Sequence, residues 1–166
     1  MVRRDENAWW SLAPHDVSVV LHLLGETPSY VCAQGLTYLQ RRDGIEDVVF
    51  LTLHFADGKA AQIHVSWLDP HKKRQLTVVG TRKMVTFDDM EATEKIRVYD
   101  KGVDTVEGSA DMAGALTVRT GEIAVPFLPP AEPLRLEMEE FLSAIRQHRP
   151  ARTDGVDGLE VVRVLD

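Results

Sequence analysis

The chain has 166 residues, 44% of them hydrophobic, and its 19 Lys and Arg against 26 Asp and Glu give a formal net charge of −7. This length suits one domain of roughly 100–200 residues and excludes two of full size. The acidic balance excludes a nucleic-acid surface, which needs clustered basic residues. The sequence has neither an apolar run long enough for a membrane span nor a signal-peptide pattern, so we expect a cytoplasmic protein with no membrane partner.

Residues 11–25 predict the first helix. Ser11 can cap its free N–H groups, Pro14 is tolerated in a first turn, and Gly25 supplies a left-handed stop. One face of this helix is apolar, with Val17, Val20, Leu21 and Leu24 at the spacing of successive helical turns.

From Ser29 onward the apolar pattern has a period of two, which is typical of strands. The expected strands are 30–33, 36–40, 46–55, 59–67, 75–79, 83–87 and 96–99.

The best hairpin joins residues 49–55 and 59–67 through a three-residue loop that ends in Gly58. With Gly58 left-handed, residue 53 pairs with 61, 51 with 63 and 49 with 65, so the apolar side chains share one face. The opposite face, with Phe50, His54 and His64, is mixed. We interpret it as a subunit interface or a surface for another layer. The alternative is a twisted sheet that tolerates a few exposed apolar residues.

The last third of the sequence predicts a loop over 101–117, a strand or hairpin over 118–126 that turns at Thr120-Gly121, and a helix over 133–148 whose apolar face packs on the sheet. Residues 158–166 begin a further helix. One helix, many antiparallel strands and then helices predict an α+β fold with an open, mostly antiparallel sheet that carries its helices on one face.

Standard cofactor and metal motifs are missing from the sequence. None of its glycines forms Gly-x-Gly or a phosphate loop, so we expect no NAD, NADP or ATP site on this chain. The histidines lack metal-ligand spacing, which predicts no metal site. Cys32 stands in an apolar strand without a basic neighbour and is interpreted as a small buried residue.

His15 is the strongest single candidate for chemistry. It follows Pro14 in the expected first helical turn, where the helix N-terminus disfavours the protonated imidazole while the adjacent Asp16 favours it. A histidine balanced in this way can act as a general acid or base near neutral pH. The alternative is a histidine that caps or packs the helix start.

A long ordered run of segments carries a family resemblance. The segments are Asn7-Ala8-Trp9-Trp10-Ser11-Leu12-Ala13-Pro14-His15-Asp16, Ile45-Glu46-Asp47, and the stretches 64–70, 76–80, 87–90, 99–102, 132–141 and 158–162. They resemble the glucose–fructose oxidoreductase/inositol dehydrogenase/MocA family of NAD(P)-dependent sugar dehydrogenases, in particular the branch that oxidises nucleotide-linked amino sugars.

The resemblance implies that residues 1–166 are a single C-terminal substrate-binding and oligomerisation domain, like that of dihydrodipicolinate reductase, without the N-terminal Rossmann domain. The chain is shorter than a complete enzyme of this family by about one dinucleotide-binding domain, roughly 120–150 residues. The implied cofactor of the complete enzyme is NAD(P). The implied partners are further copies of the chain through the open sheet face, a sugar or nucleotide-sugar substrate, and a separate Rossmann subunit if one supplies the cofactor.

The resemblance also assigns residue roles. His15 matches the family histidine that faces the reacting sugar carbon and serves in proton transfer. Many members have Asp four residues earlier, where this chain has Ser11, which places catalytic competence in question.

Arg3 and Asn7 match residues that bind substrate in the nucleotide-sugar branch. The candidates for the pocket rim or the subunit interface are Tyr38, Trp67, Lys72 and Arg74, of which Tyr38 and Trp67 are assigned to substrate binding. The alternative for each is a sheet or loop residue that binds no ligand. Two functions therefore stand: the substrate half of a sugar oxidoreductase that needs a separate cofactor half, or a non-catalytic assembly or sugar-binding module that keeps the fold.

Overall fold

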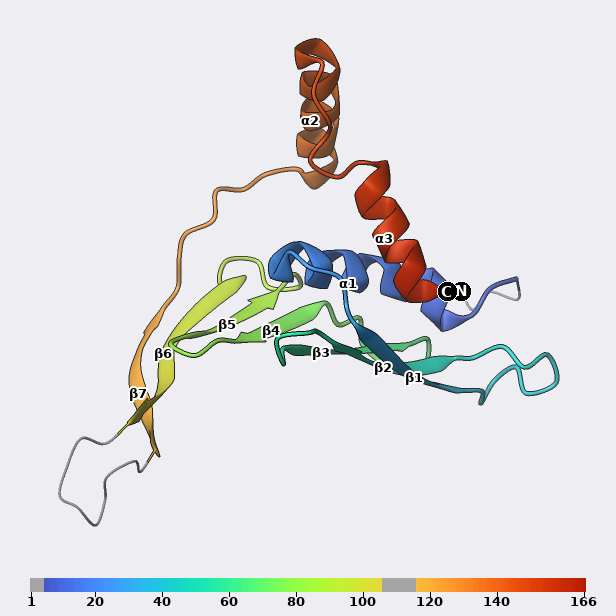
Figure 1. The fold of residues 1–166 in the computed structure, drawn as a ribbon, viewed down its shortest axis with the longest axis horizontal. Helices are drawn as coiled ribbons and strands as arrows, with labels where there is room; N and C mark the ends of the chain where they lie inside the picture. Colours follow the sequence, from blue (N-terminus) through green and yellow to red (C-terminus); the bar gives the residue numbers. More distant parts are fainter. Residues whose placement is uncertain (1–4, 106–115) are drawn as a thin grey trace. The chain divides into compact units, whose positions relative to one another are not determined.

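The computed structural model describes residues 5–105 and 116–166, and its α+β class matches the prediction (Figure 1). The chain divides into two compact units, residues 1–70 with 133–166, and residues 71–132. The first unit contains α1 (Ala8–Leu24), β1 (Tyr30–Leu36), β2 (Val48–His54), β3 (Ala60–Ser66), α2 (Pro133–Gln147) and α3 (Gly155–Leu165). The second contains β4 (Gln75–Val79), β5 (Met84–Asp88), β6 (Ile96–Thr105) and β7 (Leu116–Ala124).

The β2–β3 hairpin has the predicted register. Leu53 pairs with Ala61, Leu51 with Ile63 and Val49 with Val65. Gly58 is left-handed, with φ 85°. The alternation buries one face of the hairpin, and its core side chains are Val49, Leu51, Leu53, Phe55, Ile63 and Val65. β1 adds to β2 in antiparallel register, which gives a sheet of order β1-β2-β3.

α1 packs on β2 and β3 through the predicted apolar stripe, in which Val17 and Val20 are buried (Figure 1). Gly25 ends the helix with φ 68° and donates its N–H to the Leu21 carbonyl at 2.8 Å. α3 packs on α1 rather than on the sheet, and the Trp9 indole Nε1–H donates to the Leu165 carbonyl at 3.0 Å. An Asp154 capping box begins α3 at Gly155, so this helix starts before the predicted residue 158.

Three local predictions in the first unit are wrong. The strand β1 continues to Leu36, and the rest of the expected strand 36–40 is a loop with one bridge between Gln40 and Ile45. Cys32 is exposed and not buried, because α1 covers β2 and β3. The apolar face of α2 does not pack on the sheet, since each of Leu134, Met138, Phe141, Leu142 and Ile145 is 45–71% exposed.

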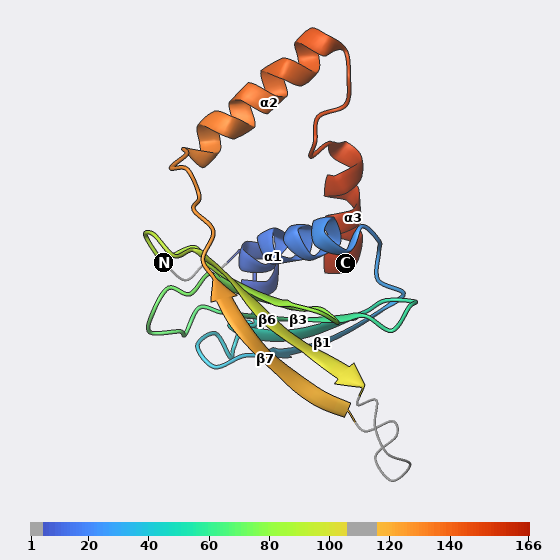
Figure 2. The ribbon, with the colours of Figure 1, turned by 90° about the vertical axis from the view of Figure 1, so that its left-hand side faces the viewer.

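The second unit is a four-stranded antiparallel sheet of order β4-β5-β6-β7. Figure 2 shows β6 and β7 running side by side. β7 continues through Thr120 and Gly121, so the predicted turn there is wrong; the irregularity is a register shift between Tyr99 and Lys101 of β6. A Cβ on Gly121 would meet the Asp100 side chain at 2.4 Å, so the glycine is required by close packing and not by a turn. Most of the predicted loop 101–117 lies outside the described residues.

Hydrogen bonds from Arg149 and Arg152 join the segment after α2 to Glu140 in the helix. The Arg149 guanidinium donates to both carboxylate oxygens of Glu140, at 2.7 and 2.9 Å, and the Arg152 backbone N–H donates to Glu140 at 3.0 Å. These hydrogen bonds, with Arg149 foremost, lower the pKa of Glu140 from 4.5 to about 2. A depressed carboxyl pKa stabilises the fold above the unfolded value of 4.5, and this contribution is lost as the pH falls towards 2.

We therefore expect the Glu140 side-chain carboxyl to titrate with a midpoint of about 2. In Arg149→Ala the midpoint should rise towards 4.5, because the first and largest cause of the shift is removed. The measurement is an NMR titration of the side-chain carboxyl carbon. Arg135→Ala, which removes an ion pair elsewhere on α2, is the control. An unshifted midpoint in Arg149→Ala contradicts this assignment.

Candidate functional site

The dipeptide Glu46-Asp47 joins three parts of the first unit. The Glu46 carbonyl accepts from the Ala8 N–H at 2.8 Å, and its carboxylate accepts from the Asn7 side-chain amide at 3.0 Å. The start of α1 is therefore attached to the residues that lead into β2.

Asp47 is fully buried. Its Oδ2 accepts the backbone N–H groups of Tyr38 and Leu39, both at 2.6 Å, while its own carbonyl accepts the Trp67 N–H at 3.0 Å. Its second oxygen, Oδ1, is buried with no hydrogen-bond partner among the described residues. An unmatched buried acceptor costs about 1–3 kcal/mol. Asp47 thus connects the two predicted pocket residues, Tyr38 and Trp67.

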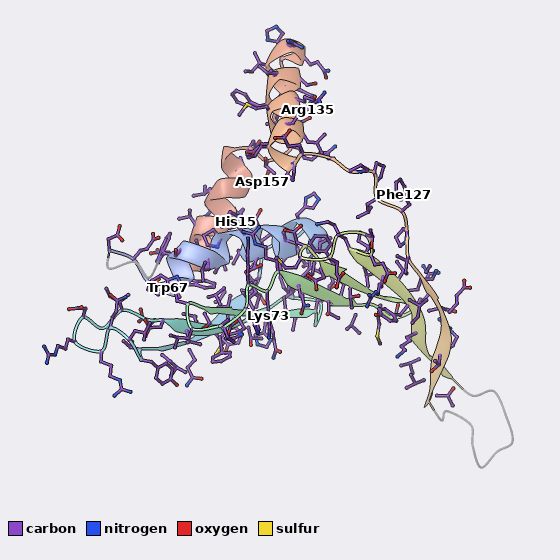
Figure 3. All side chains as sticks on the ribbon, turned by 180° about the vertical axis from the view of Figure 1, so that it is seen from behind. His15, Trp67, Lys73, Phe127, Arg135 and Asp157 are labelled. Atoms are coloured by element: carbon purple, nitrogen blue, oxygen red, sulfur yellow. The ribbon has the colours of Figure 1, made fainter. Side chains whose placement is uncertain are left out.

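Tyr38 and Trp67 are held by their backbones and keep their side chains available. Tyr38 is 50% exposed, and Trp67 is partly buried immediately after β3 (Figure 3). Among the described residues no hydrogen bond ties the Tyr38 hydroxyl or the Trp67 indole N–H. Both groups can therefore donate to an oxygen-rich ligand.

His15 lies on α1 with its side chain exposed (Figure 3). Because α1 begins at Ala8, His15 is in its third turn, and the predicted first-turn position is wrong. The helix-end field falls off within one turn, so it does not act on this imidazole. His15 makes no hydrogen bond within the described part of the chain. Ser11 precedes it by one helical turn, on the same face.

The cap of α1 is Asn7 and not the predicted Ser11. Asn7 Oδ1 accepts the Trp10 N–H at 3.0 Å, and its amide donates to Glu46. Both polar ends of this predicted substrate-binding side chain are thus engaged within the protein. Pro14 falls inside the helix, which is why the proline rule placed the helix start too late.

The remaining predicted residues lie in the second unit or outside the described residues. Arg3 lies outside the described residues. Lys72 and Arg74 belong to the second unit, where Arg74 pairs with Asp89 at 3.6 Å. No group of three or more His, Cys, Asp or Glu side chains with the geometry of a metal site occurs in residues 5–105 and 116–166. None of the described helices is long and apolar enough to cross a membrane.

Sequence reasoning missed Asp47 and Glu46 as the residues that connect this site. They stand at the start of the expected strand 46–55, and no local pattern marks them as connecting residues. Only the pairing of β1 with β2 and of β2 with β3 brings Tyr38, Trp67 and α1 to the same pair of residues.

Comparison with known proteins identifies the family. A family model described as the GFO/IDH/MocA C-terminal domain matches residues 3–86, more than half of the chain. The chain belongs to this family. His15, Arg3, Asn7, Tyr38 and Trp67 all fall within the matched residues.

One curated relative of this family domain is UDP-N-acetylglucosamine 3-dehydrogenase from Acidithiobacillus ferrooxidans, which is 27% identical over 148 residues. The alignment covers 89% of this chain and 43% of the relative. The chain therefore spans less than half of that relative's length.

Solved structures share the fold. The A. ferrooxidans enzyme aligns with a TM-score of 0.72 and 21% identity, over 96% of this chain and 45% of that one. A protein from Magnetospirillum magnetotacticum MS-1 aligns with a TM-score of 0.72 and 30% identity, over 95% and 47%. The WlbA dehydrogenase from Bordetella pertussis, solved with NADH and UDP-GlcNAcA, aligns with a TM-score of 0.62 and 22% identity, over 96% and 40%.

Asn7→Ala removes the α1 cap and the link to Glu46, and it should lower the free energy of unfolding by about 1–2 kcal/mol. Ser11→Ala is the matched control and should change it by less than about 0.5 kcal/mol. Urea denaturation followed by circular dichroism measures both. Equal effects, or a larger one at Ser11, contradict the assignment of Asn7 as the cap.

Proposed function

We propose that this chain is the substrate-binding and oligomerisation half of an NAD(P)-dependent sugar or nucleotide-sugar oxidoreductase. The observation that carries the proposal is the position of all five predicted site residues within the family match at 3–86. The hydrogen bonds of Glu46 and Asp47 support it, because they tie α1, Tyr38 and Trp67 into one framework. The name of the A. ferrooxidans relative favours UDP-N-acetylglucosamine as the first ligand to test.

In this proposal His15 accepts the proton of a sugar hydroxyl. An exposed imidazole without a hydrogen-bond partner among the described residues is available both to a ligand and to solvent, as a general base requires. Tyr38 and Trp67 bind the sugar by ring contacts and by their O–H and N–H donors. Arg3 and Asn7 bind the nucleotide-linked part, Asn7 once a ligand replaces its contact with Glu46.

The dinucleotide itself does not fit the residues of this chain. All strand pairs in the two described sheets are antiparallel, and the sequence has no Gly-x-Gly. A dinucleotide site of the Rossmann type needs a parallel βαβ unit with a glycine-rich turn at the helix N-terminus. We therefore assign the cofactor to a Rossmann domain outside residues 1–166, on the same protein or on a partner subunit.

The outer face of β1-β2-β3 is proposed as the interface between copies of the chain. Phe50 is 46% exposed and stacks on His64 with ring centroids 4.6 Å apart; Tyr30 stacks on His54 at 4.9 Å. These cross-strand pairs leave flat ring surfaces in solvent. Burial of aromatic surface is the dominant gain in such contacts.

A second candidate function is a non-catalytic assembly or sugar-binding module. Ser11 favours it, because Ser11 lies one turn before His15 on the same helical face, where many family members carry Asp. A carboxylate at that position would orient the imidazole, whereas a serine hydroxyl holds no charge.

The ligand test titrates the purified full chain separately with UDP-N-acetylglucosamine, NADH and NADPH, and assays turnover with NAD and NADP. We expect UDP-N-acetylglucosamine to shift the Tyr38 and Trp67 resonances in NMR spectra, with no saturable binding of either dinucleotide and no turnover. Tight cofactor binding or turnover by this chain alone contradicts the division of the enzyme. Absence of sugar-nucleotide binding contradicts the substrate-binding role.

The assembly test uses light scattering at tens of micromolar chain. We expect a dimer or larger assembly for the unchanged protein, and a shift to monomer in Phe50→Glu, because the variant places a charge in an apolar contact. Phe127→Glu is the matched control: Phe127 is 84% exposed, between β7 and α2, and its variant should assemble as before. A chain that is monomeric throughout contradicts the oligomerisation role.

A further inference from the structure

We propose that Asp47 is the positioning residue of the sugar site, fixing Tyr38 and Trp67 relative to each other. The inference rests on the proposed function, because Asp47 would position residues of the proposed sugar site without being part of it. Asp47 is buried and does not reach a ligand, so it acts only through the two residues it holds.

The loop between β1 and β2 is anchored at its stem by this carboxylate. Oδ2 receives two N–H groups from consecutive residues, Tyr38 and Leu39, at 2.6 Å each. A single carboxylate oxygen thus fixes two consecutive backbone N–H groups. The tip of the loop closes on itself, with Asp43 and Gly44 both donating to the Gln40 carbonyl. The backbone position of Tyr38 therefore depends on the Asp47 side chain.

Trp67 is linked to the same residue from the opposite side. The ladder between β2 and β3 ends at Val48 and Ser66, so Trp67 is the first residue beyond it. Its N–H extends the pairing to the Asp47 carbonyl at 3.0 Å. A shift of Asp47 would move the loop residue and the tryptophan together.

An amide cannot replace the carboxylate here. In an asparagine the oxygen can take the place of Oδ2 and accept both N–H groups, but without the negative charge that strengthens these bonds. Its NH₂ then takes the place of Oδ1, which is buried and has no hydrogen-bond partner among the described residues. In the other orientation NH₂ faces the Tyr38 and Leu39 donors. Both arrangements weaken the anchor while the backbone bonds of Asp47 to Leu36 and Trp67 remain.

The test compares Asp47→Asn with Asp43→Asn, which makes the same chemical change at the exposed tip of the same loop. Without ligand, we expect Asp47→Asn to shift the ring resonances of Tyr38, which the side chain holds. The Trp67 resonances, held through a backbone bond, and the methyl resonances of the core residues Val17 and Leu53 should stay in place. With UDP-N-acetylglucosamine as probe, the Kd should rise on the order of tenfold. Asp43→Asn should leave the resonances and the Kd unchanged.

The outcomes separate this inference from the proposed function. Unchanged Tyr38 resonances in a folded Asp47→Asn protein overturn the positioning role, as does an unchanged Kd when the unmodified chain binds the probe. If the unmodified chain does not bind the probe, the proposed function fails and the resonances still decide the anchoring. If Asp47→Asn does not fold, amide exchange in the unmodified chain decides it: Tyr38 and Leu39 should exchange more slowly than Asp43 and Gly44, and equal protection overturns the anchor.

Discussion

The register of β2 against β3 is the constraint on which the first unit depends. A shift of one residue would exchange the two faces of the hairpin, because side chains alternate along a strand. The observed register gives α1 a continuous apolar surface and leaves the aromatic and histidine side chains on the other face. It also places Asp47 and Trp67 opposite each other, each one residue beyond the last pair of the ladder, Val48 and Ser66. The site therefore inherits its geometry from the strand pairing.

Asp47 is energetically unfavourable by itself. Burial of a carboxylate with one oxygen unmatched is unfavourable. Its two short amide bonds recover part of this cost and remove the freedom of the loop stem. Stability alone gives a weak reason for this residue, whereas a requirement to fix Tyr38 and Trp67 gives a direct one.

Much of the fold can be predicted from the sequence, since alternation and turn chemistry are local signals. Both were sufficient for the hairpin around Gly58 and for the Gly25 end of α1. The sequence predicts the start of α1 too late because Pro14 favours a first turn, whereas the cap is Asn7, whose Oδ1 accepts the Trp10 N–H. That error also gave His15 an electrostatic setting that it lacks.

The rest of the site depends on contacts between distant segments. Asp47 reaches Tyr38 and Trp67 only when three strands have paired, and a lone buried aspartate has no periodic signature. The α2 helix shows a second limit of sequence patterns. Its pattern correctly indicates an apolar face, but periodicity cannot name the surface that covers it, and within the described residues that face stays exposed.

The anchoring through Glu46 and Asp47 also affects how such a domain can work with a separate cofactor domain. Tyr38, Trp67 and α1 are joined by hydrogen bonds internal to one compact unit. A site fixed in this way pays its ordering entropy on folding and not on binding, which is the advantage of preorganisation. Its geometry would then be set before any cofactor domain docks. Under the proposed function, a docking domain would have to supply only the dinucleotide and its orientation towards His15.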